Sequence, residues 1–357
     1  MHESLAQHIS AQTLKALESP PFPDADRTLV ESFIAPTRSL LSGGKRIRGL
    51  LSVAGAMCAR GSQPTGDDVE VAVAIELFQG AALVHDDIMD DSPTRRGQPA
   101  VHVAFAHDFD RSSLVGDSAD YGRDAGICSG DFLLALAGSH MVMHGSAPSA
   151  RRFNTMCAEV AFGQFLDIRA ENIDLVALLE SPDPRSALLR ARDDAFAVLR
   201  HKSARYSVRD PLLIGAESAG ADEDLLALLT SIGAPLGEAF QLRDDALGLA
   251  GDPAATGKPT GGDLREGKRT VLILTALARL AGTPEAHMIA QSLGTDVSDA
   301  QARTITDLVI ESGAWAEHED LIDERESRAR QSWEKLPEGP GKDMLDSLMS
   351  ALTNRRF

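Results

Sequence analysis

Apolar residues recur at helical spacing along most of the chain. Between Val69 and Asp90, apolar side chains stand at positions 71, 74, 75, 78 and 82, the three- and four-residue steps of one helix face. Ala and Leu outnumber the β-branched and aromatic residues, which also favours helix over strand. The same spacing predicts further helices over residues 27–42, 46–60, 126–145, 150–172, 186–206, 223–250, 268–283 and 300–335.

Short segments rich in Gly, Pro, Ser and Asp separate the predicted helices. They occupy residues 19–23, 61–68, 145–149, 181–184 and 251–263. None has the character of a linker between independent domains, and no internal repeat is evident. Residues 107–124, the longest polar stretch, are predicted to be a surface loop without obvious chemistry. We expect residues 1–357 to form one all-α domain, a large helical bundle of ten or more helices.

Composition and charge narrow the class of protein. Hydrophobic residues make up 43% of the 357 and charged residues 25%, which excludes a disordered chain. A net charge of -18 argues against binding to nucleic acid or anionic lipid. No stretch approaches the roughly 18–20 uninterrupted apolar residues that span a bilayer. The three cysteines suggest no disulfide framework and the N-terminus no signal peptide, so we expect a cytoplasmic protein without a membrane span.

The most informative motif is HDDIMDD, at the end of the predicted helix over 69–90. Asp86 and Asp90 stand one turn apart on one helix face, with Asp87 beside them. Such like charges destabilise a helix unless something compensates, and a hard divalent cation would do so. A solvated acidic helix end is the alternative. Arg95 and Arg96 follow directly, and arginines beside a metal-bound carboxylate cluster suit a polyphosphate ligand.

A second acidic pair, Asp244–Asp245, ends the predicted helix over 223–250. Gly248 stands at the i+4 position where a third carboxylate is absent, and Asp252 lies a further turn along. Taken alone, this pair is typical of an ordinary charged helix terminus. Together with the first cluster it suggests a polynuclear metal site.

Basic residues form one compact motif and several single positions. In GGKRIRG, Lys45, Arg46 and Arg48 follow a Gly pair that lets the backbone approach a ligand closely. Single lysines occur at 202, 258 and 268, and each alone is typical of a solvated surface. The TGKP segment does not have the spacing of a Walker A motif.

Taken together, these motifs resemble the trans-type isoprenyl diphosphate synthases, the family of the farnesyl and geranylgeranyl diphosphate synthases. Seven patches occur in the family's order: GGKRIRG, ELFQGAALVHDDIMDDSPTRRGQ, CSGDFLLA, FGQFLDI, HKSARYS, GEAFQLRDD and TGKPTGGDLREGKRT. The resemblance implies an all-α fold around a central active-site cavity and a homodimer. It also implies Mg²⁺-dependent, head-to-tail joining of an allylic diphosphate to isopentenyl diphosphate, with Mn²⁺ as an alternative ion.

The resemblance also implies roles for individual residues. Mg²⁺ would be held by Asp86, Asp90 and Asp244, supported by Asp87 and Asp245. The allylic diphosphate would be bound by Arg95, Lys202, Lys258, Lys268 and Gln241. Isopentenyl diphosphate would be bound by Lys45, Arg48, Gln79 and Arg96. The catalytic set would comprise Asp86, Asp87, Asp90, Arg95, Lys202, Asp244 and Lys258.

Three positions depart from the family's usual pattern. Gln79 stands where the family often has His, and either side chain can donate to a phosphate oxygen. Ser203 replaces the more usual Thr after Lys202, and its hydroxyl dipole could face a developing cation. Gly248 puts a third ligand in the second aspartate motif in doubt. A C-terminal basic group often caps the isopentenyl pocket in this family, and Arg355 or Arg356 could serve, although the match there is poor.

Helix geometry suggests a product length. Ala82 and Ala81 lie roughly 6–7.5 Å below Asp86 along the helix, and Phe78 roughly 12 Å below it. In this family, large aromatic residues at the positions of these alanines favour the shorter farnesyl product. Two alanines therefore predict geranylgeranyl diphosphate, with Phe78 as the residue at the bottom of the cavity that stops chain growth. Alternatively, Phe78 is ordinary core and the product is farnesyl or a longer polyprenyl diphosphate.

Two other functions compete. A class I terpene cyclase also ionises a diphosphate at an aspartate-rich helix, but a cyclase would give no reason for two separate sets of basic residues. A non-catalytic partner subunit of a heteromeric synthase is expected to lack the first aspartate cluster, which this chain keeps.

Overall fold

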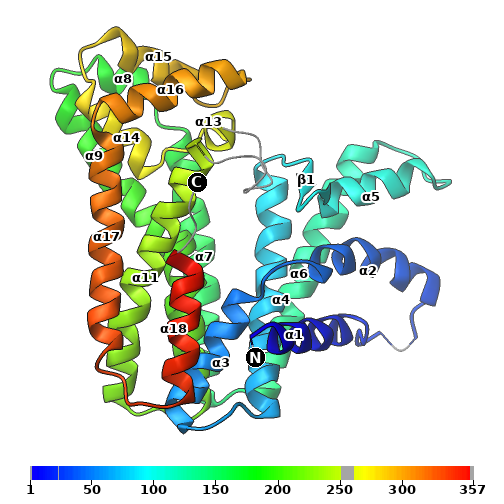
Figure 1. Ribbon diagram of the computed structural model, residues 1–357. Helices are drawn as coiled ribbons and strands as arrows, with labels where there is room; N and C mark the ends of the chain where they lie inside the picture. The colour runs from blue at the N-terminus through cyan, green and yellow to red at the C-terminus, as the bar shows by residue number, and fades with distance from the viewer. Residues whose placement is uncertain (1, 23, 251–260, 354–357) are drawn as a thin grey trace. The chain divides into compact units, whose positions relative to one another are not determined.

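The computed structural model is almost entirely helical, and it describes residues 2–22, 24–250 and 261–353 (Figure 1). The all-α prediction is therefore confirmed. The described chain divides into two compact units, and each is considered by itself. Unit 1 comprises Met1–Asn154, Pro211–Leu226 and Pro337–Leu348, and unit 2 comprises Thr155–Asp210, Ala227–Leu336 and Met349–Phe357. The prediction of a single domain stays a prediction.

Unit 1 contains the N-terminal helices and a short hairpin. Its elements are α1 (His2–Leu17), α2 (Arg27–Ser42), α3 (Ile47–Arg60), α4 (Gly66–Met89), β1 (Thr94–Arg95), β2 (Gln98–Pro99), α5 (Val101–Asp110) and α6 (Ser118–His144). Unit 1 also includes most of α10 (Asp210–Ser218) and α18 (Pro340–Thr353) and the start of α7 (Ala147–Glu171).

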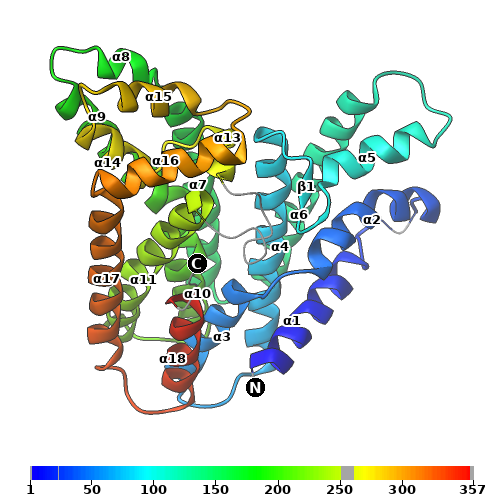
Figure 2. The same ribbon diagram turned by 45° about the horizontal axis from the view of Figure 1, so that its top comes forward.

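Helix α4 is the central helix of unit 1. Thr65 begins it with a capping box, in which its hydroxyl accepts from the Asp68 N–H while the Asp68 carboxylate accepts from the Thr65 N–H. Every residue from 71 to 81 is buried, so α4 is enclosed on all sides along this stretch. Helix α6 lies beside it in both views (Figures 1 and 2). This burial fixes the direction in which α4 presents its C-terminal aspartates.

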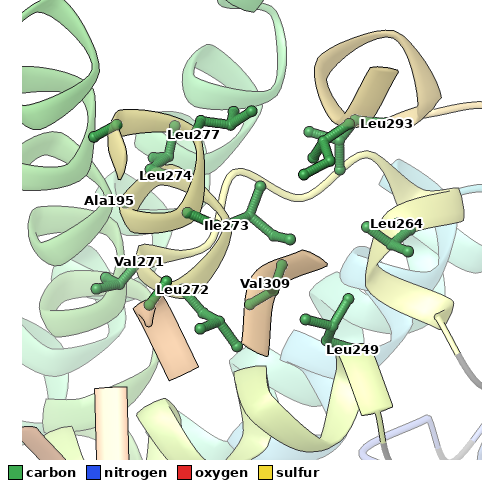
Figure 3. Close-up of a cluster of buried hydrophobic side chains, with 14 of the residues drawn as sticks. Ala195, Leu249, Leu264, Val271, Leu272, Ile273, Leu274, Leu277, Leu293 and Val309 are labelled. Carbon is green, nitrogen blue, oxygen red and sulfur yellow. The ribbon is translucent and has the colours of Figure 1, made fainter. Parts of the chain in front are cut away.

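Unit 2 is built around a second core. Its elements are most of α7, α8 (Leu175–Leu179), α9 (Pro184–Val198), a π-helix η1 (Leu199–Arg209), most of α11 (Glu223–Ala250), α13 (Gly262–Glu266), α14 (Val271–Arg279), α15 (Pro284–Ser292), α16 (Asp299–Glu311) and α17 (Ala314–Trp333). Residues 271–278 of α14 are all buried, which is the pattern of a core helix. Figure 3 shows Leu272 and Ile273 of this helix among side chains such as Leu249 and Val309.

One expectation about the fold was wrong in part. Residues 107–124 were predicted to be a surface loop, but only 111–117 form one, because α5 extends to Asp110 and α6 begins at Ser118. Asp117 caps α6 by accepting from the Asp120 N–H, and the rings of Phe109 and Tyr121 lie 5.1 Å apart across the connection. The polar residues of this stretch lie mostly on exposed helix faces, which is why the segment resembles a loop in sequence.

Other differences concern helix boundaries. The predicted helix over 300–335 is two helices, separated at Gly313, whose φ is 77°. The predicted helix over 186–206 continues into η1.

Helices α6 and α11 are long and apolar enough to cross a membrane by length and composition. About half of the apolar window of α11 is buried, and core helices of soluble proteins have the same character.

Candidate active site

The C-terminal turn of α4 carries the first aspartate cluster. Asp86 and Asp90 are half-buried, and the Asp90 N–H donates to the Asp86 carbonyl at 2.9 Å. Asp87 is fully buried, and burial raises the pKa of its carboxyl group although Arg95 opposes the shift. Its Oδ1 accepts from Arg95 Nε at 2.7 Å, while its Oδ2 has no hydrogen-bond partner within the described residues. Asp86 and Asp90 are carboxylates that could hold a cation at the end of α4, while Asp87 holds Arg95.

A two-residue hairpin turn positions the two arginines. Strands β1 and β2 pair antiparallel, and the turn residues Arg96 and Gly97 have φ values of 55° and 74°. Positive φ at both positions is the geometry of a type I′ turn, which suits a two-residue hairpin loop. Nη2 of Arg95 lies 3.6 Å from Asp86 Oδ2, so Arg95 contacts the aspartate cluster directly.

Arg96 faces the segment that joins α2 and α3. Its Nη1 donates to the carbonyls of Leu40 at 3.1 Å and Gly43 at 2.5 Å. A cavity of about 270 Å³ lies here in unit 1, and its polar and charged lining includes Ser39, Ser42, Arg95, Arg96 and Gln98. Burial lowers the pKa of Arg96, and the positive charges of Arg46, Arg95 and Arg48 lower it further, against the influence of Glu76. An anion bound in this cavity would relieve that repulsion.

The GGKRIRG motif divides into structural and accessible cations. Arg46 is buried, donates to Ser10 Oγ at 2.7 Å and lies 3.3 Å from a Glu76 carboxylate oxygen. It therefore ties the motif to α1 and α4. Lys45 is exposed and Arg48 half-buried, so these two cations are accessible to a ligand.

The residues predicted to set product length lie along α4. Phe78 is 5% exposed and packs edge-to-face against Phe153, with ring centroids 5.9 Å apart. Ala81 is buried and Ala82 half-buried. Gln79, predicted to bind isopentenyl diphosphate, is 8% exposed on the same helix.

In unit 2, the π-helix η1 carries Lys202 and Ser203, both half-buried. Lys202 forms an ion pair with Asp167, one helical turn after Gly163 on α7. A Cβ on Gly163 would lie only 2.2 Å from the Lys202 backbone nitrogen, so glycine is needed for this close approach of α7 and η1. The sequence did not identify Asp167 as a site residue, although it lies within the FGQFLDI motif.

The second aspartate motif is joined by Asp263, a carboxylate outside the motif's own sequence. Gln241 Nε2 donates to Asp245 Oδ1 at 2.9 Å. Burial raises the pKa of Asp245 well above its ordinary value, and the negative charges of Asp263 and Asp244 add to the shift. A cation at Asp244, Asp245 and Asp263 would relieve this repulsion.

Asp263 fills the space beside Gly248. A Cβ on Gly248 would lie 2.0 Å from Asp263 Oδ2, so the Asp263 carboxylate occupies the volume of a side chain at 248. The third carboxylate that the motif lacks is thus supplied from α13. Lys268 Nζ lies 3.9 Å from Asp263 Oδ1 and pairs more closely with Glu266.

We expect Gly248→Ala to reduce activity more than stability. The new methyl group would displace the Asp263 carboxylate, which can rotate away at small cost but would leave its position among Asp244 and Asp245. By analogy with groups that position metal ligands, activity should fall about 10–100-fold. Turnover and thermal unfolding of the variant would be compared with Gly138→Ala, because a Cβ at Gly138 meets nothing within 4 Å. Equal turnover in the two variants would contradict this role of Asp263.

Four positions considered from the sequence lie outside the described residues. They are Asp252, Lys258, Arg355 and Arg356.

The donor chemistry of both clusters fits a hard divalent cation. Asp86 and Asp90 in unit 1, and Asp244, Asp245 and Asp263 in unit 2, offer carboxylate oxygens, the ligands that Mg²⁺ prefers.

Comparisons with known proteins agree with this chemistry. The family model described as "Polyprenyl synthetase" matches residues 30–309. A geranylfarnesyl diphosphate synthase from Aeropyrum pernix is 30% identical over 88% of this chain and 91% of its own, and a nonaprenyl diphosphate synthase from Mycobacterium tuberculosis is 29% identical over 88% and 84%.

Among solved structures, the fold resembles that of geranylgeranyl pyrophosphate synthase from Corynebacterium glutamicum, complexed with isoprenyl diphosphate and magnesium. The two chains are 34% identical with a TM-score of 0.85, over 99% of this chain and 98% of the other. With a family model over most of its length and this likeness in sequence and fold, the chain belongs to the polyprenyl synthetase family and is a polyprenyl diphosphate synthase, a prenyltransferase with the isoprenoid synthase fold.

Proposed function

We propose that this prenyltransferase condenses isopentenyl diphosphate head to tail with an allylic diphosphate (dimethylallyl, geranyl or farnesyl) and mainly makes geranylgeranyl diphosphate. The observation that carries the reaction is the pair Asp86 and Asp90 at the end of α4, followed at once by the hairpin of Arg95 and Arg96. A carboxylate pair for a cation, with arginines beside it, is what binding of a diphosphate requires.

The test is an assay of the purified chain with isopentenyl diphosphate and each allylic primer, with products resolved by chain length. Elongated diphosphates from the chain alone support the proposal and exclude a non-catalytic partner subunit. Incubation with geranylgeranyl diphosphate alone separates it from a terpene cyclase, because only a cyclase would release a hydrocarbon.

Asp86, Asp90 and Asp244 are the proposed ligands of Mg²⁺, for which Mn²⁺ can substitute, with Asp87, Asp245 and Asp263 in support. The bound ions supply positive charge to the leaving diphosphate. Arg95, held by Asp87, donates hydrogen bonds to the same diphosphate. Lys202, Lys268, Gln241 and Lys258 complete this set.

Isopentenyl diphosphate is assigned to the basic residues around the Arg96 cavity. The lowered pKa of Arg96 beside three other arginines supports an anion there. Lys45 and Arg48 are the accessible cations of the adjoining motif, and Gln79 is the amide donor from α4. Ser203 is assigned to the developing carbocation, since it follows Lys202 on η1.

Kinetics should separate the two basic sets. We expect Lys45→Ala or Arg48→Ala mainly to raise KM for isopentenyl diphosphate, because each removes a cation that binds the unreacted substrate. Lys202→Ala or Lys258→Ala should mainly lower kcat, by slowing ionisation of the allylic diphosphate, because the negative charge on the leaving group grows in the transition state. Steady-state kinetics with each substrate varied would be measured, with Lys15→Ala, an exposed lysine on α1, as control. The same defect in all four variants would refute the assignment of two pockets.

The product length rests on α4. Two small residues, Ala81 and Ala82, leave room at the depth where an aromatic side chain would stop a shorter chain. Phe78, one further turn along, is the residue proposed to stop growth of the chain. The relatives described above have products of several lengths, so the product assay is the deciding measurement.

A homodimer in the cytoplasm is the proposed state. Within unit 1, α6 exposes large apolar side chains, among them Ile127, Leu134, Val142 and Met143. Large apolar side chains exposed on one helix support an interaction surface there. Cys58, Cys128 and Cys157 are all free, which supports a reducing compartment. Sedimentation of the purified chain should give twice the 38.0 kDa of one chain, and cell fractionation tests the location.

A further inference from the structure

Two histidines and a glutamate meet near the N-terminal end of α4, away from the aspartate cluster. Glu70 lies 16 residues before Asp86, or about 24 Å along the helix at 1.5 Å per residue. His140 and His144 reach it from the last turns of α6. The potential ligand atoms of these three side chains all lie within 4.8 Å of one another, and all belong to unit 1.

The contacts within this cluster are close. His140 is 9% exposed, and its Nε2 lies 2.7 Å from Glu70 Oε2. The rings of His140 and His144 are 4.7 Å apart between centroids, and His144 Nδ1 lies 3.8 Å from Asp67 Oδ1. Asp67, whose side chain is 79% exposed, therefore lies at the edge of the cluster, one helical turn before Glu70.

Helix geometry explains why these side chains converge. Histidines at i and i+4 share one helix face, which is the spacing that lets two imidazoles take a single ion. Asp67 and Glu70, at i and i+3, likewise share a face of α4. The neighbouring Asp68 is engaged elsewhere, in the capping box and with Arg60 at 2.8 Å. The acidic start of α4 thus divides into a capping carboxylate and two that face α6.

A hydrogen bond between His140 and Glu70 accounts for one imidazole only. It gives no reason for the second imidazole of His144 beside it. A tetrahedral ion with ligands at about 2.0–2.2 Å would set ligand atoms roughly 3.3–3.6 Å from one another. The observed separations of 2.7 and 3.8 Å lie on either side of these values, and the ligand atoms of Glu70, His140 and His144 all lie within 4.8 Å of one another.

We propose that Glu70, His140 and His144, with Asp67 as the fourth ligand, bind one divalent transition-metal ion, for which Zn²⁺ has the best-matched chemistry. Imidazole nitrogen favours Zn²⁺ and Co²⁺ over Mg²⁺, whose ligands are oxygen atoms. The proposed ligands are different residues from Asp86, Asp90 and Asp244, which are proposed to bind Mg²⁺. The ion ties the start of α4 to the end of α6 and stabilises the folded chain by mass action.

The test uses the full chain, freed of metal with a chelator and then equilibrated with Zn²⁺ or Co²⁺ in excess Mg²⁺. Retained metal would be measured by elemental analysis, Co²⁺ coordination by visible absorption, and stability by thermal unfolding. We expect one ion per chain, a nitrogen-containing tetrahedral Co²⁺ spectrum and a raised Tm. Asp86→Asn should leave all three unchanged, because it alters only the Mg²⁺ site.

Two variants probe the ligands with different structural risk. Glu70→Gln keeps a hydrogen-bond partner for His140 but removes the anionic ligand, and His144→Ala removes a partly exposed ring. Each should weaken Zn²⁺ binding at least tenfold and abolish the metal-dependent rise in Tm, with unchanged Tm in chelator. His8→Ala, an exposed histidine on α1, is the control.

Two outcomes would overturn the proposal. Binding that survives both ligand variants would place the ion elsewhere on the chain. Failure of the parent chain to retain Zn²⁺ or Co²⁺ would leave Glu70 and His140 as a hydrogen-bonded pair only. Neither outcome bears on the prenyltransferase reaction, which the product assay tests independently.

Discussion

Replacing Asp86 by Asn or Ala should lower turnover by on the order of 10²–10³-fold or more while leaving the fold intact. Asp86 is one of the two carboxylates proposed to hold Mg²⁺ at the C-terminal end of α4, and without it the leaving diphosphate would lose cationic stabilisation. The fold should survive because the change removes a like-charge pair at i and i+4, which destabilises a helix by a few tenths of a kcal/mol. Steady-state turnover over a range of Mg²⁺ concentrations, with thermal unfolding in parallel, measures both effects.

Asp91→Asn is the matched control for this experiment. Asp91 is exposed just beyond α4 with a φ of 48°, a conformation that Asn also tolerates. The change removes one carboxylate charge next to the cluster while leaving both proposed ligands, Asp86 and Asp90, in place. Turnover of this variant should therefore stay close to that of the parent chain. Wild-type turnover in Asp86→Asn, or full activity in excess chelator, would contradict the proposed role of the first cluster.

Site residues could be predicted from the sequence where they lie close together along the chain. Asp86, Asp90, Arg95 and Arg96 were found because they lie within eleven consecutive residues, where spacing alone carries the information. Asp263 was missed because its partner Gly248 is fifteen residues away and only packing brings the two together. The same holds for the partner of Lys202, which lies on a different helix.

The histidine cluster shows a different limit of sequence reasoning. The spacing of His140 and His144 was visible in the sequence, but two histidines one turn apart are common on ordinary helices. Only the approach of Glu70 from α4, 2.7 Å from His140, turns the pair into a candidate site.

The fold itself was predicted best where helices are most buried. Continuous apolar periodicity identified α4 and α11, because a core helix must present apolar side chains on several faces. The end of α5 and the start of α6 were mistaken for parts of a loop, because exposed helix faces and turns are equally polar. Helix α1 was not predicted, because only a few of its residues are buried and its apolar signal is weak.

The packing around α4 separates its faces and makes the product-length hypothesis testable. A Cβ on Gly80 would lie 2.8 Å from a Leu41 methyl group and 3.1 Å from one of Leu133, so that side of α4 is closed by α2 and α6. Asp86, Ala82 and Phe78 lie at successive steps of four residues, on a different side of the helix. The growing chain is proposed to follow this stripe from Asp86 toward Phe78.

We expect Ala81→Phe to shorten the main product and Phe78→Ala to lengthen it. A phenyl ring at 81 would fill the proposed path before its floor, whereas removing the Phe78 ring would open the path toward Phe153. If Ala81 instead faces closed packing, the added ring would cost about 1–3 kcal/mol of stability. Loss of the buried Phe78 ring should cost about 3–5 kcal/mol in either case, so stability alone does not decide its role. Products would be resolved by chain length with each primer, and Phe105→Leu, a buried ring on α5, controls for general loss of core packing. Unchanged product length in both α4 variants, with activity retained, would show that this face of α4 does not determine product length.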